Sequence, residues 1–263
     1  GAGGGVFGTF ATDRPVGFTT EELCATSQAF YGLTHILETH MLRTTAVNLL
    51  DTYVGKRAGQ RILGGQIGRG SGEGIGAVIW FSDLRNFTAM SDHMPRDELI
   101  ALLNDYFDHL ARPIESHGGE ILKFMGDGVL AVFPTAELGG EAEASRRAIA
   151  AAKAARDAVD GWNGERQAQG LPAVGHGIAL HAGEVNFGNV GSSTRLDFTV
   201  VGPAVNLVHR LERLCGELDV PLILSEAVAR HVPDEATALG ARALRGLREP
   251  QGVFTLAGLG NAD

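Results

Sequence analysis

Cysteine is scarce in this chain, and the two that occur, Cys24 and Cys215, are far apart in the sequence. Two isolated cysteines do not build a disulfide framework or a cysteine-based zinc site, so we expect reduced thiols. No apolar run approaches the roughly 20 residues needed to cross a bilayer, and no secretory signal is visible. These absences predict a cytoplasmic protein with no membrane segment.

Excess positive charge is lacking too, because the net charge is −9 and the pI is about 5.5. A general nucleic-acid binder shows a basic patch or stripe, so we expect no nucleic-acid partner. The acidic balance does not exclude an anionic substrate, since metal ions and a few local Arg or Lys residues set the field inside a site. The 263 residues, 44% of them hydrophobic, suffice for one large domain or a domain with an appendage.

The first 76 residues differ from the rest in their pattern. Thr19-Thr20-Glu21-Glu22 has the form of a capping box, and apolar residues then recur at three- and four-residue steps, which predicts a helix over 20–58. Too few of them keep a heptad register to decide whether this helix forms a coiled coil. Residues 64–76 hold seven glycines in thirteen positions and predict a flexible connector. They precede a strand rather than follow one, so they are not a dinucleotide-binding loop.

From residue 77 on, strands and helices mix without strict alternation, which predicts an α+β fold. The expected helices cover about 95–117, 141–169, 203–216 and 225–231. The expected strands cover 77–83, a hairpin at 120–133, then 176–183, 184–191, 195–201, 221–224, 240–244 and 252–256.

Two aspartates stand where apolar, β-branched runs end or turn. Asp83 lies in AVIWFSDLRNFT, and Asp127 lies in GGEILKFMGDGVLAVF. Two carboxylates at strand ends can hold a pair of divalent cations about 4 Å apart, as in phosphoryl chemistry. Mg²⁺ is usually bound by one or two carboxylates together with the substrate's phosphates. Either aspartate alone would equally suit an exposed strand end or turn, but the two together favour a two-metal site.

A third signature, LDFTVVGPAVNLVHRLE at residues 196–212, adds Asn206 and Arg210. They are four residues apart on a predicted helix and therefore share one face. An arginine beside a carboxamide suits a transferring phosphoryl group, because the guanidinium offers a fixed fork of donors. Seen alone, both would be ordinary helix-surface residues.

Together the three signatures resemble the class III nucleotidyl cyclases, over about residues 77–257. The resemblance implies a mostly antiparallel central sheet with flanking helices. It also implies a homodimer with two shared active sites, each holding two Mg²⁺ or Mn²⁺ ions. The metal ligands would be Asp83, Asp127 and the backbone carbonyl of Leu84.

The same resemblance assigns the residues that would contact the substrate. Asn206 would orient the ribose and Arg210 would stabilise the pentavalent phosphorus. Lys123 and Thr199 would read the purine. Arg245 would contact the terminal phosphates. The chain after Asp83 should turn from strand into helix, so the backbone N–H groups of Asn86, Phe87 and Thr88 would bind phosphate.

Donor and acceptor matching favours ATP at the purine pair. Adenine presents an acceptor at N1 and a donor amine at N6, while Lys123 donates and the Thr199 hydroxyl can accept. Guanine inverts both groups and would want an acceptor opposite N1. A lysine in mid-strand is usually just a solvated charge, so its place four residues before Asp127 is what singles it out.

Two positions depart from the family's pattern. Asn86 stands where the family usually has glycine, and asparagine tolerates a left-handed backbone better than most residues. His209 replaces the small residue usual before the arginine, and we expect it either to crowd the helix or to pack at an interface.

These patterns predict an adenylate cyclase that converts ATP to 3′,5′-cyclic AMP and pyrophosphate. The alternatives are a guanylate cyclase and a catalytically silent nucleotide-binding or dimerisation module of a signalling protein. Residues 1–18 resemble, weakly, the remnant of a GAF-like sensor domain. Residues 19–76 would be a helical transducer with its connector, and residues 77–263 the catalytic domain. An upstream sensor domain is therefore expected.

Overall fold

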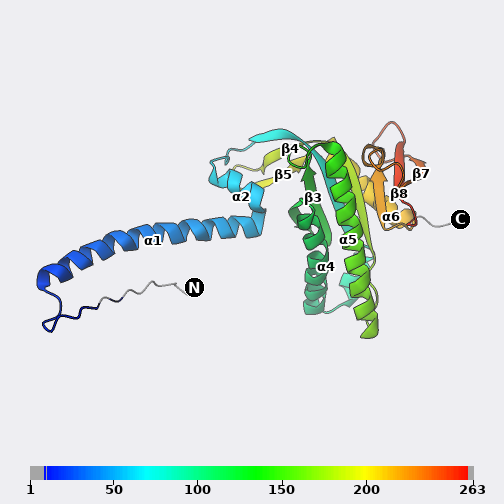
Figure 1. Cartoon of the computed structure of the whole chain (residues 1–263). Helices are drawn as coiled ribbons and strands as arrows, with labels where there is room; N and C mark the ends of the chain where they lie inside the picture. Colours follow the sequence, from blue (N-terminus) through cyan, green and yellow to red (C-terminus); the bar gives the residue numbers. More distant parts are fainter. Residues whose placement is uncertain (1–8, 10, 260–263) are drawn as a thin grey trace. The chain divides into compact units, whose positions relative to one another are not determined.

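The computed structural model describes residue 9 and residues 11–259, and the chain divides into two compact units, Gly1–Tyr53 and Val54–Asp263 (Figure 1). The first unit contains most of a single helix, α1 (Thr20–Val54). The second unit contains every other helix and strand of the described residues. Much of the expected sensor remnant at 1–18 lies outside the described residues.

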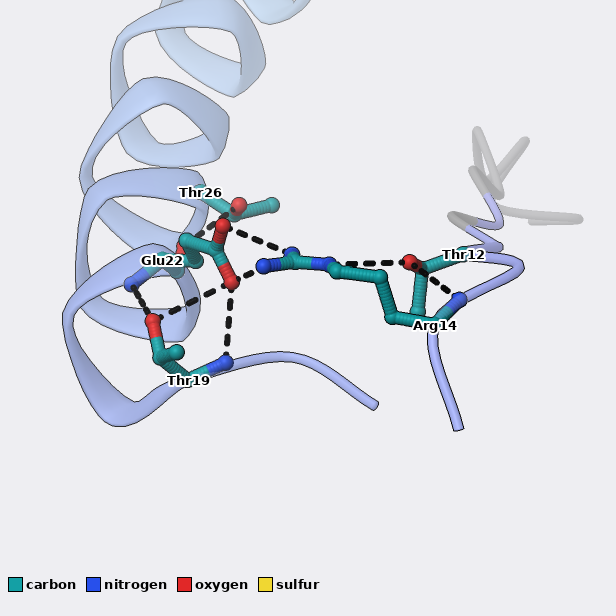
Figure 2. A network of polar contacts seen from close by, with 5 residues as sticks. All are labelled: Thr12, Arg14, Thr19, Glu22 and Thr26. Carbon is teal, nitrogen blue, oxygen red and sulfur yellow. Dashed lines mark hydrogen bonds and ion pairs between the residues drawn. The ribbon is translucent and has the colours of Figure 1, made fainter. Parts of the chain in front are cut away.

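The capping box predicted at the start of α1 is confirmed. The Thr19 N–H donates to the Glu22 carboxylate at 2.9 Å, and the Glu22 N–H donates back to the Thr19 hydroxyl at 3.3 Å (Figure 2). Arg14 closes the motif with an ion pair to Glu22 at 2.7 Å. This reciprocal pairing satisfies N–H groups that have no partner inside the helix.

The helix predicted over 20–58 is wrong at its C-terminal end. Gly55 has a φ of 86°, outside the helical range, and a separate helix, α2 (Lys56–Leu63), begins after it. α1 is described along its whole length and buries none of its residues. α2 by contrast buries Ala58 completely within the second unit.

The second unit is built on an eight-stranded sheet in the order β2-β3-β1-β4-β6-β8-β7, with β5 paired to β4. Every pair is antiparallel except β4 with β6. This confirms the predicted α+β class. The strands are β1 (Gly72–Leu84), β2 (Glu120–Met125), β3 (Gly128–Pro134), β4 (His176–Gly191), β5 (Leu196–Val201), β6 (Leu222–Ser225), β7 (Ala236–Arg242) and β8 (Gln251–Leu256). The remaining helices are α3 (Phe87–His93), α4 (Arg96–Ser116), α5 (Glu141–Ala168), α6 (Pro203–Glu217) and α7 (Glu226–Ala229).

Three strand predictions need correction. The strand expected at 240–244 runs from Ala236 to Arg242 as β7. The strands expected at 176–183 and 184–191 form one continuous strand, β4. β1 begins at Gly72, so the end of the connector predicted at 64–76 is extended sheet. Gly188 of β4 lies opposite Gly72 at the start of β1. A Cβ on Gly188 would lie 2.3 Å from the Ser71 carbonyl oxygen, so only glycine fits at this close approach of the two backbones.

The two faces of the sheet carry different helices. α4 and α5 lie side by side on one face of the sheet (Figure 1). Alternate residues of β1, such as Val78 and Trp80, pack against these two helices. The intervening residues Ile79 and Phe81 pack with α6 and α2 on the other. Side chains alternate along a strand, so Asp83 falls on the α6 face. No helix in the described part of the chain is both long and apolar enough to span a membrane.

Candidate active site

The sheet register brings the two predicted metal carboxylates together. Asp83 is the penultimate residue of β1, and Asp127 occupies the turn between β2 and β3. Ser82 lies opposite Val129 in the β1–β3 ladder, so the turn that carries Asp127 falls beside the end of β1. Gly126, with a φ of 67°, supplies the left-handed residue that this tight turn requires.

Electrostatics at this end of the sheet favours a cation. Burial, followed by hydrogen bonding and like charge from Asp127, raises the pKa of Asp83 to about 8. The Oδ1 atom of Asp83 is buried and has no hydrogen-bond partner among the described residues. Two carboxylates this close cannot both ionise at low cost unless a positive charge joins them. The local chemistry therefore fits a divalent metal ion.

A third acid, Glu212 of α6, approaches the pair and was not singled out from the sequence. Its Oε1 atom lies 2.8 Å from where a Cβ on Gly177 would stand, and Gly177 is the register partner of Asp83. Burial raises the pKa of Glu212 to about 7. At about 100° per residue, Glu212 lies about 200° around α6 from Arg210. Glu212 is therefore on a different side of α6 from Asn206 and Arg210, and the helical spacing of those two residues did not indicate it.

The number of protein ligands suits magnesium or manganese. No group of three or more His, Cys, Asp or Glu side chains with metal-binding geometry occurs among the described residues. Mg²⁺ commonly takes only one or two carboxylates and completes its shell with water and substrate phosphates. Asp83, Asp127 and the Leu84 carbonyl would hold such ions, and Glu212 is a neighbour of the pair.

The predicted purine readers lie on β2 and β5. The Lys123 ammonium donates to the Asp197 carboxylate at 2.8 Å. Thr199 is 7% exposed, and its hydroxyl oxygen has no hydrogen-bond partner in the described part of the chain. A cavity of about 600 Å³ opens beside Lys123 and Asp197, with Arg195 at its wall. β2 and β5 are not paired with each other in the sheet, but the Lys123–Asp197 ion pair links them. Thr199 lies two residues further along β5, and its hydroxyl has no partner in the described part of the chain.

Asp197 is the second residue that sequence reasoning missed. It stands two positions before Thr199 on β5, and residues two apart in a strand share a face. That spacing was a usable signal. Lys123 was predicted to contact the purine, and the structure shows that its ammonium also pairs with Asp197 of the same chain.

Asn206 and Arg210 lie on the first half of α6, which begins with Pro203 in its first turn. The Arg210 guanidinium lies 3.4 Å from where a Cβ on Gly246 would stand, and Gly246 has a φ of 81°. The structure therefore brings Arg210 to the loop that carries Arg245, which is exposed. The sequence resemblance assigned both arginines to phosphate contacts.

The two departures from the family pattern are both accommodated. Asn86 has φ 60° and ψ 24°, the left-handed conformation expected for a glycine substitute, and it precedes α3. Its neighbour Phe87 packs against the core and Thr88 is exposed. His209 stacks on Phe81 with ring centroids 3.8 Å apart, so it packs within its own chain instead of crowding the helix.

Adenylate cyclases from other organisms are similar to this region in sequence. The chain is 36% identical over 159 residues to an adenylate cyclase of Anabaena cylindrica, covering 59% of this chain and 30% of that protein. It is 28% identical over 183 residues to adenylate cyclase 1 of Rhizobium meliloti (strain 1021), covering 68% of this chain and 27% of that protein. The chain thus spans less than a third of the length of these two curated relatives.

Solved structures are similar as well. The adenylyl cyclase CyaB from P. aeruginosa has a TM-score of 0.64 at 25% identity, covering 71% of this chain and 95% of that one. The guanylyl cyclase Cya2 has a TM-score of 0.61 at 31% identity, covering 72% of this chain and 95% of that one. Because proteins of both names share the fold, the fold does not choose the purine. Residues 75–255 match the family model described as the adenylate and guanylate cyclase catalytic domain, and the chain belongs to this family, the class III nucleotidyl cyclases.

Proposed function

We propose that this chain is the catalytic part of an adenylate cyclase, which converts ATP to 3′,5′-cyclic AMP and pyrophosphate in the cytoplasm. The observation that carries the proposal is the convergence of Asp83 and Asp127 at the strand ends, where burial and like charge raise the pKa of Asp83 to about 8. Such a pair is poorly satisfied alone and suits two Mg²⁺ or Mn²⁺ ions bound together with a nucleotide triphosphate.

In the proposed reaction the ribose 3′-hydroxyl gives its proton to solvent water, and its oxygen attacks the α-phosphorus in line. The bond from that phosphorus to the bridging oxygen breaks, and pyrophosphate leaves. Mg²⁺ or Mn²⁺ ions held by Asp83, Asp127 and the Leu84 carbonyl would neutralise charge on the phosphates and lower the pKa of the attacking hydroxyl. Asn206 orients the ribose, and Arg210 donates to the oxygens on which charge develops. Arg245 and the backbone of Asn86, Phe87 and Thr88 bind the phosphates.

The choice of ATP rests on Lys123 and Thr199. An ammonium group has three donors, so Lys123 can keep its 2.8 Å bond to Asp197 and still donate to adenine N1. The unpartnered Thr199 oxygen is available to accept from the adenine amine. Asp197 thereby fixes the direction of the lysine side chain and lowers the entropy lost when the base binds.

One observation favours a second candidate, a guanylate cyclase. The Asp197 carboxylate lies beside Lys123 and is mostly exposed, at 61% of its side chain. It offers the acceptor that guanine would need for its N1–H. GTP use is therefore the specific alternative, and it depends on whether the base meets Lys123 or Asp197.

The arrangement of residues around α6 supports shared sites in a homodimer. Asn206 and Arg210 are separated by only about 40° around the helix, whereas Glu212 is about 200° from Arg210. Glu212 faces the metal carboxylates of its own chain, as its effect on the pKa of Asp83 shows. Asn206 is exposed on another side of α6, so we propose that it and Arg210 serve the metal pair of a second copy.

The test is a product assay. Purified protein is incubated with ATP or GTP in Mg²⁺ or Mn²⁺, and the nucleotide product is identified by mass. We expect cyclic AMP, with a higher kcat/KM for ATP than for GTP and no product in excess chelator. A preference for GTP would replace this proposal with the guanylate cyclase. Nucleotide binding without any cyclic product would make the chain a silent module.

A further inference from the structure

A second cavity lies behind the metal end of the sheet. It has a volume of about 500 Å³, within the range of small-molecule sites. Its floor is His176 and Val174, at and just before the start of β4, and its walls include Arg85 and Arg156. Arg85 directly follows the last residue of β1, and Arg156 comes from α5. None of these residues is assigned to the proposed reaction.

The cavity is lined by a buried polar group that has no partner. His176 is 6% exposed, and its Nε2 atom makes no hydrogen bond among the described residues. The Nε atom of Arg85 is buried and equally without a partner there. Buried donors left unpaired are costly, and most are satisfied by a ligand or an ordered water. Two such atoms at one cavity indicate an occupant with acceptor atoms.

The charge around the cavity selects the kind of occupant. Burial, followed by the charges of Arg85 and Arg156, lowers the pKa of His176 to about 4, so the ring is neutral and can donate from Nε2. The Arg156 guanidinium pairs with the Asp157 carboxylate at 2.9 Å, and its Nε atom lies 3.9 Å from the Asp160 carboxylate. Asp160 and Asp219 are mostly exposed, at 68% and 77% of their side chains. The side chains of Arg85 and Arg156, 27% and 25% exposed, are therefore more buried than the carboxylates that lie beside them.

Arg85 connects this cavity to both halves of the proposed active site. Its guanidinium donates to the Cys215 carbonyl at 2.8 Å and to the Val220 carbonyl at 2.6 Å, and it pairs with Asp219 at 2.8 Å. These contacts tie the C-terminal end of α6 to the end of β1. His176 is in turn the register partner of Leu84. An occupant that contacts Arg85 and His176 thus touches the supports of the metal ligands and of α6.

We propose that this cavity binds a small oxyanion, a carboxylate or a phosphate-like group, through Arg85, Arg156 and His176, and that binding alters turnover at the active site. Guanidinium groups are suited to such oxygens. The binding part stands apart from the proposed cyclase activity, whereas the effect on turnover rests on it.

Binding is measured first, with inorganic phosphate and acetate as probes against chloride at constant ionic strength, without nucleotide or metal. Isothermal titration should give a Kd on the order of 1 mM for at least one probe. Phosphate and acetate separate the two sources of the oxyanion group. Arg156→Gln should weaken that Kd about tenfold, since a hydrogen bond between charged groups is lost. Arg146→Gln, on the same helix but outside the cavity, should not change it.

Three results would overturn the site. No binding of either probe means that the cavity holds water only. Equal binding to Arg156→Gln means that the anion sits elsewhere, for example on the nucleotide phosphate loop. Equal weakening in Arg156→Gln and Arg146→Gln means a general charge effect. Circular dichroism and melting curves of both variants show whether either change has unfolded the protein.

Turnover is measured separately at saturating ATP, where competition for the nucleotide site no longer affects the rate. The bound probe should change kcat about fivefold in the wild type and in Arg146→Gln, a typical coupling between two sites. The same concentration should leave kcat of Arg156→Gln unchanged. Binding without any change in kcat of an active enzyme would keep the site and refute its regulatory role. An inactive wild type would instead refute the proposed function, leaving the binding result intact.

Discussion

The two ends of the proposed active site handle charge in opposite ways. At the metal end, Asp83, Asp127 and Glu212 come together, and the pKa values of Asp83 and Glu212 rise to about 8 and about 7. At the base-reading edge, Lys123 and Asp197 already neutralise each other at 2.8 Å. The carboxylates at the metal end therefore have no opposite charge of their own, whereas the charge of Lys123 is already balanced and only the Thr199 hydroxyl lacks a partner at the base-reading edge.

This difference separates two kinds of contribution to function. A cluster of like charges gains free energy when a cation binds, so it should govern whether the chain is active at all. A paired lysine gains less from one more hydrogen bond, so it should govern which purine is preferred. Variants at the two ends should accordingly differ in the size and in the nature of their effects.

The largest effect is expected at the metal end. Asp83→Ala or Asp127→Ala should lower kcat by about 10²-fold or more, because charge stabilisation at the phosphates is lost. Melting temperature should not fall, since each change also relieves repulsion. Asp108→Ala, an exposed acid on α4, is the matched control and should keep full activity. Near-normal turnover of either metal-end variant in Mg²⁺ would refute the metal assignment.

The next effect tests whether the two ends of one chain serve different sites. Asp83→Ala and Arg210→Ala homodimers should each be inactive. After mixing and random exchange, about half of the dimers are mixed and each holds one intact site, so about a quarter of the wild-type sites should return. Activity of the mixture is measured once exchange has been shown by mass-tagged subunits. A mixture that stays inactive would mean that each chain holds a complete site.

A smaller effect is expected at the base-reading edge. Lys123→Glu combined with Thr199→Ala should move the ratio of kcat/KM for ATP over GTP by about tenfold or more toward GTP, as charged hydrogen bonds commonly discriminate. Asp197→Ala should move the ratio toward ATP if Asp197 is what accepts from guanine. A ratio that neither variant changes would mean that other residues read the base.

Local pattern was sufficient where short-range geometry decides the outcome. The hairpin that carries Asp127, the capping box at Thr19 and the left-handed Asn86 all follow from a few neighbouring residues. Glu212 and Asp197 were missed because their partners are distant in sequence. Only the β1–β4 register places Gly177 beside Asp83, and with it Glu212. The break at Gly55 was missed because apolar residues keep recurring at helical spacing on both sides of it, although the helical backbone is interrupted there.

The boundary between the two units gives a prediction of intermediate size for stability. Arg57 of α2 pairs with Glu120, whose pKa is raised by burial and partly restored by Arg57. Removal of residues 1–53 should leave the melting temperature of the second unit unchanged. Removal of residues 1–60 also deletes Arg57 and the buried Ala58, and should lower it by about 5 °C or more. Equal melting temperatures would show that α2 contributes nothing to the fold.

The same two truncations test regulation. If residues 1–53 transmit an upstream signal, their removal should change specific activity or the concentration dependence of activity, as a weaker dimer would. Unchanged specific activity at every protein concentration would make this segment a passive tether.

The smallest effect concerns pH, and it sharpens the contrast between the two ends. The folded pKa of Asp83, about 8, lies above its ordinary value of 3.8. Between these values the folded state keeps a proton that the unfolded chain has lost, so the free energy of unfolding falls as pH rises from about 4 to about 8. Glu212 acts in the same direction up to about pH 7. In chelator, the melting temperature should therefore fall by a few degrees over this window, and it should fall less in Asp83→Asn.

Mg²⁺ should reverse this trend, because it binds the deprotonated carboxylates. The increase in melting temperature caused by Mg²⁺ should therefore be larger at about pH 8 than at about pH 6. A Mg²⁺ effect that is the same at both pH values, or the same in Asp83→Asn, would separate the raised pKa from metal binding.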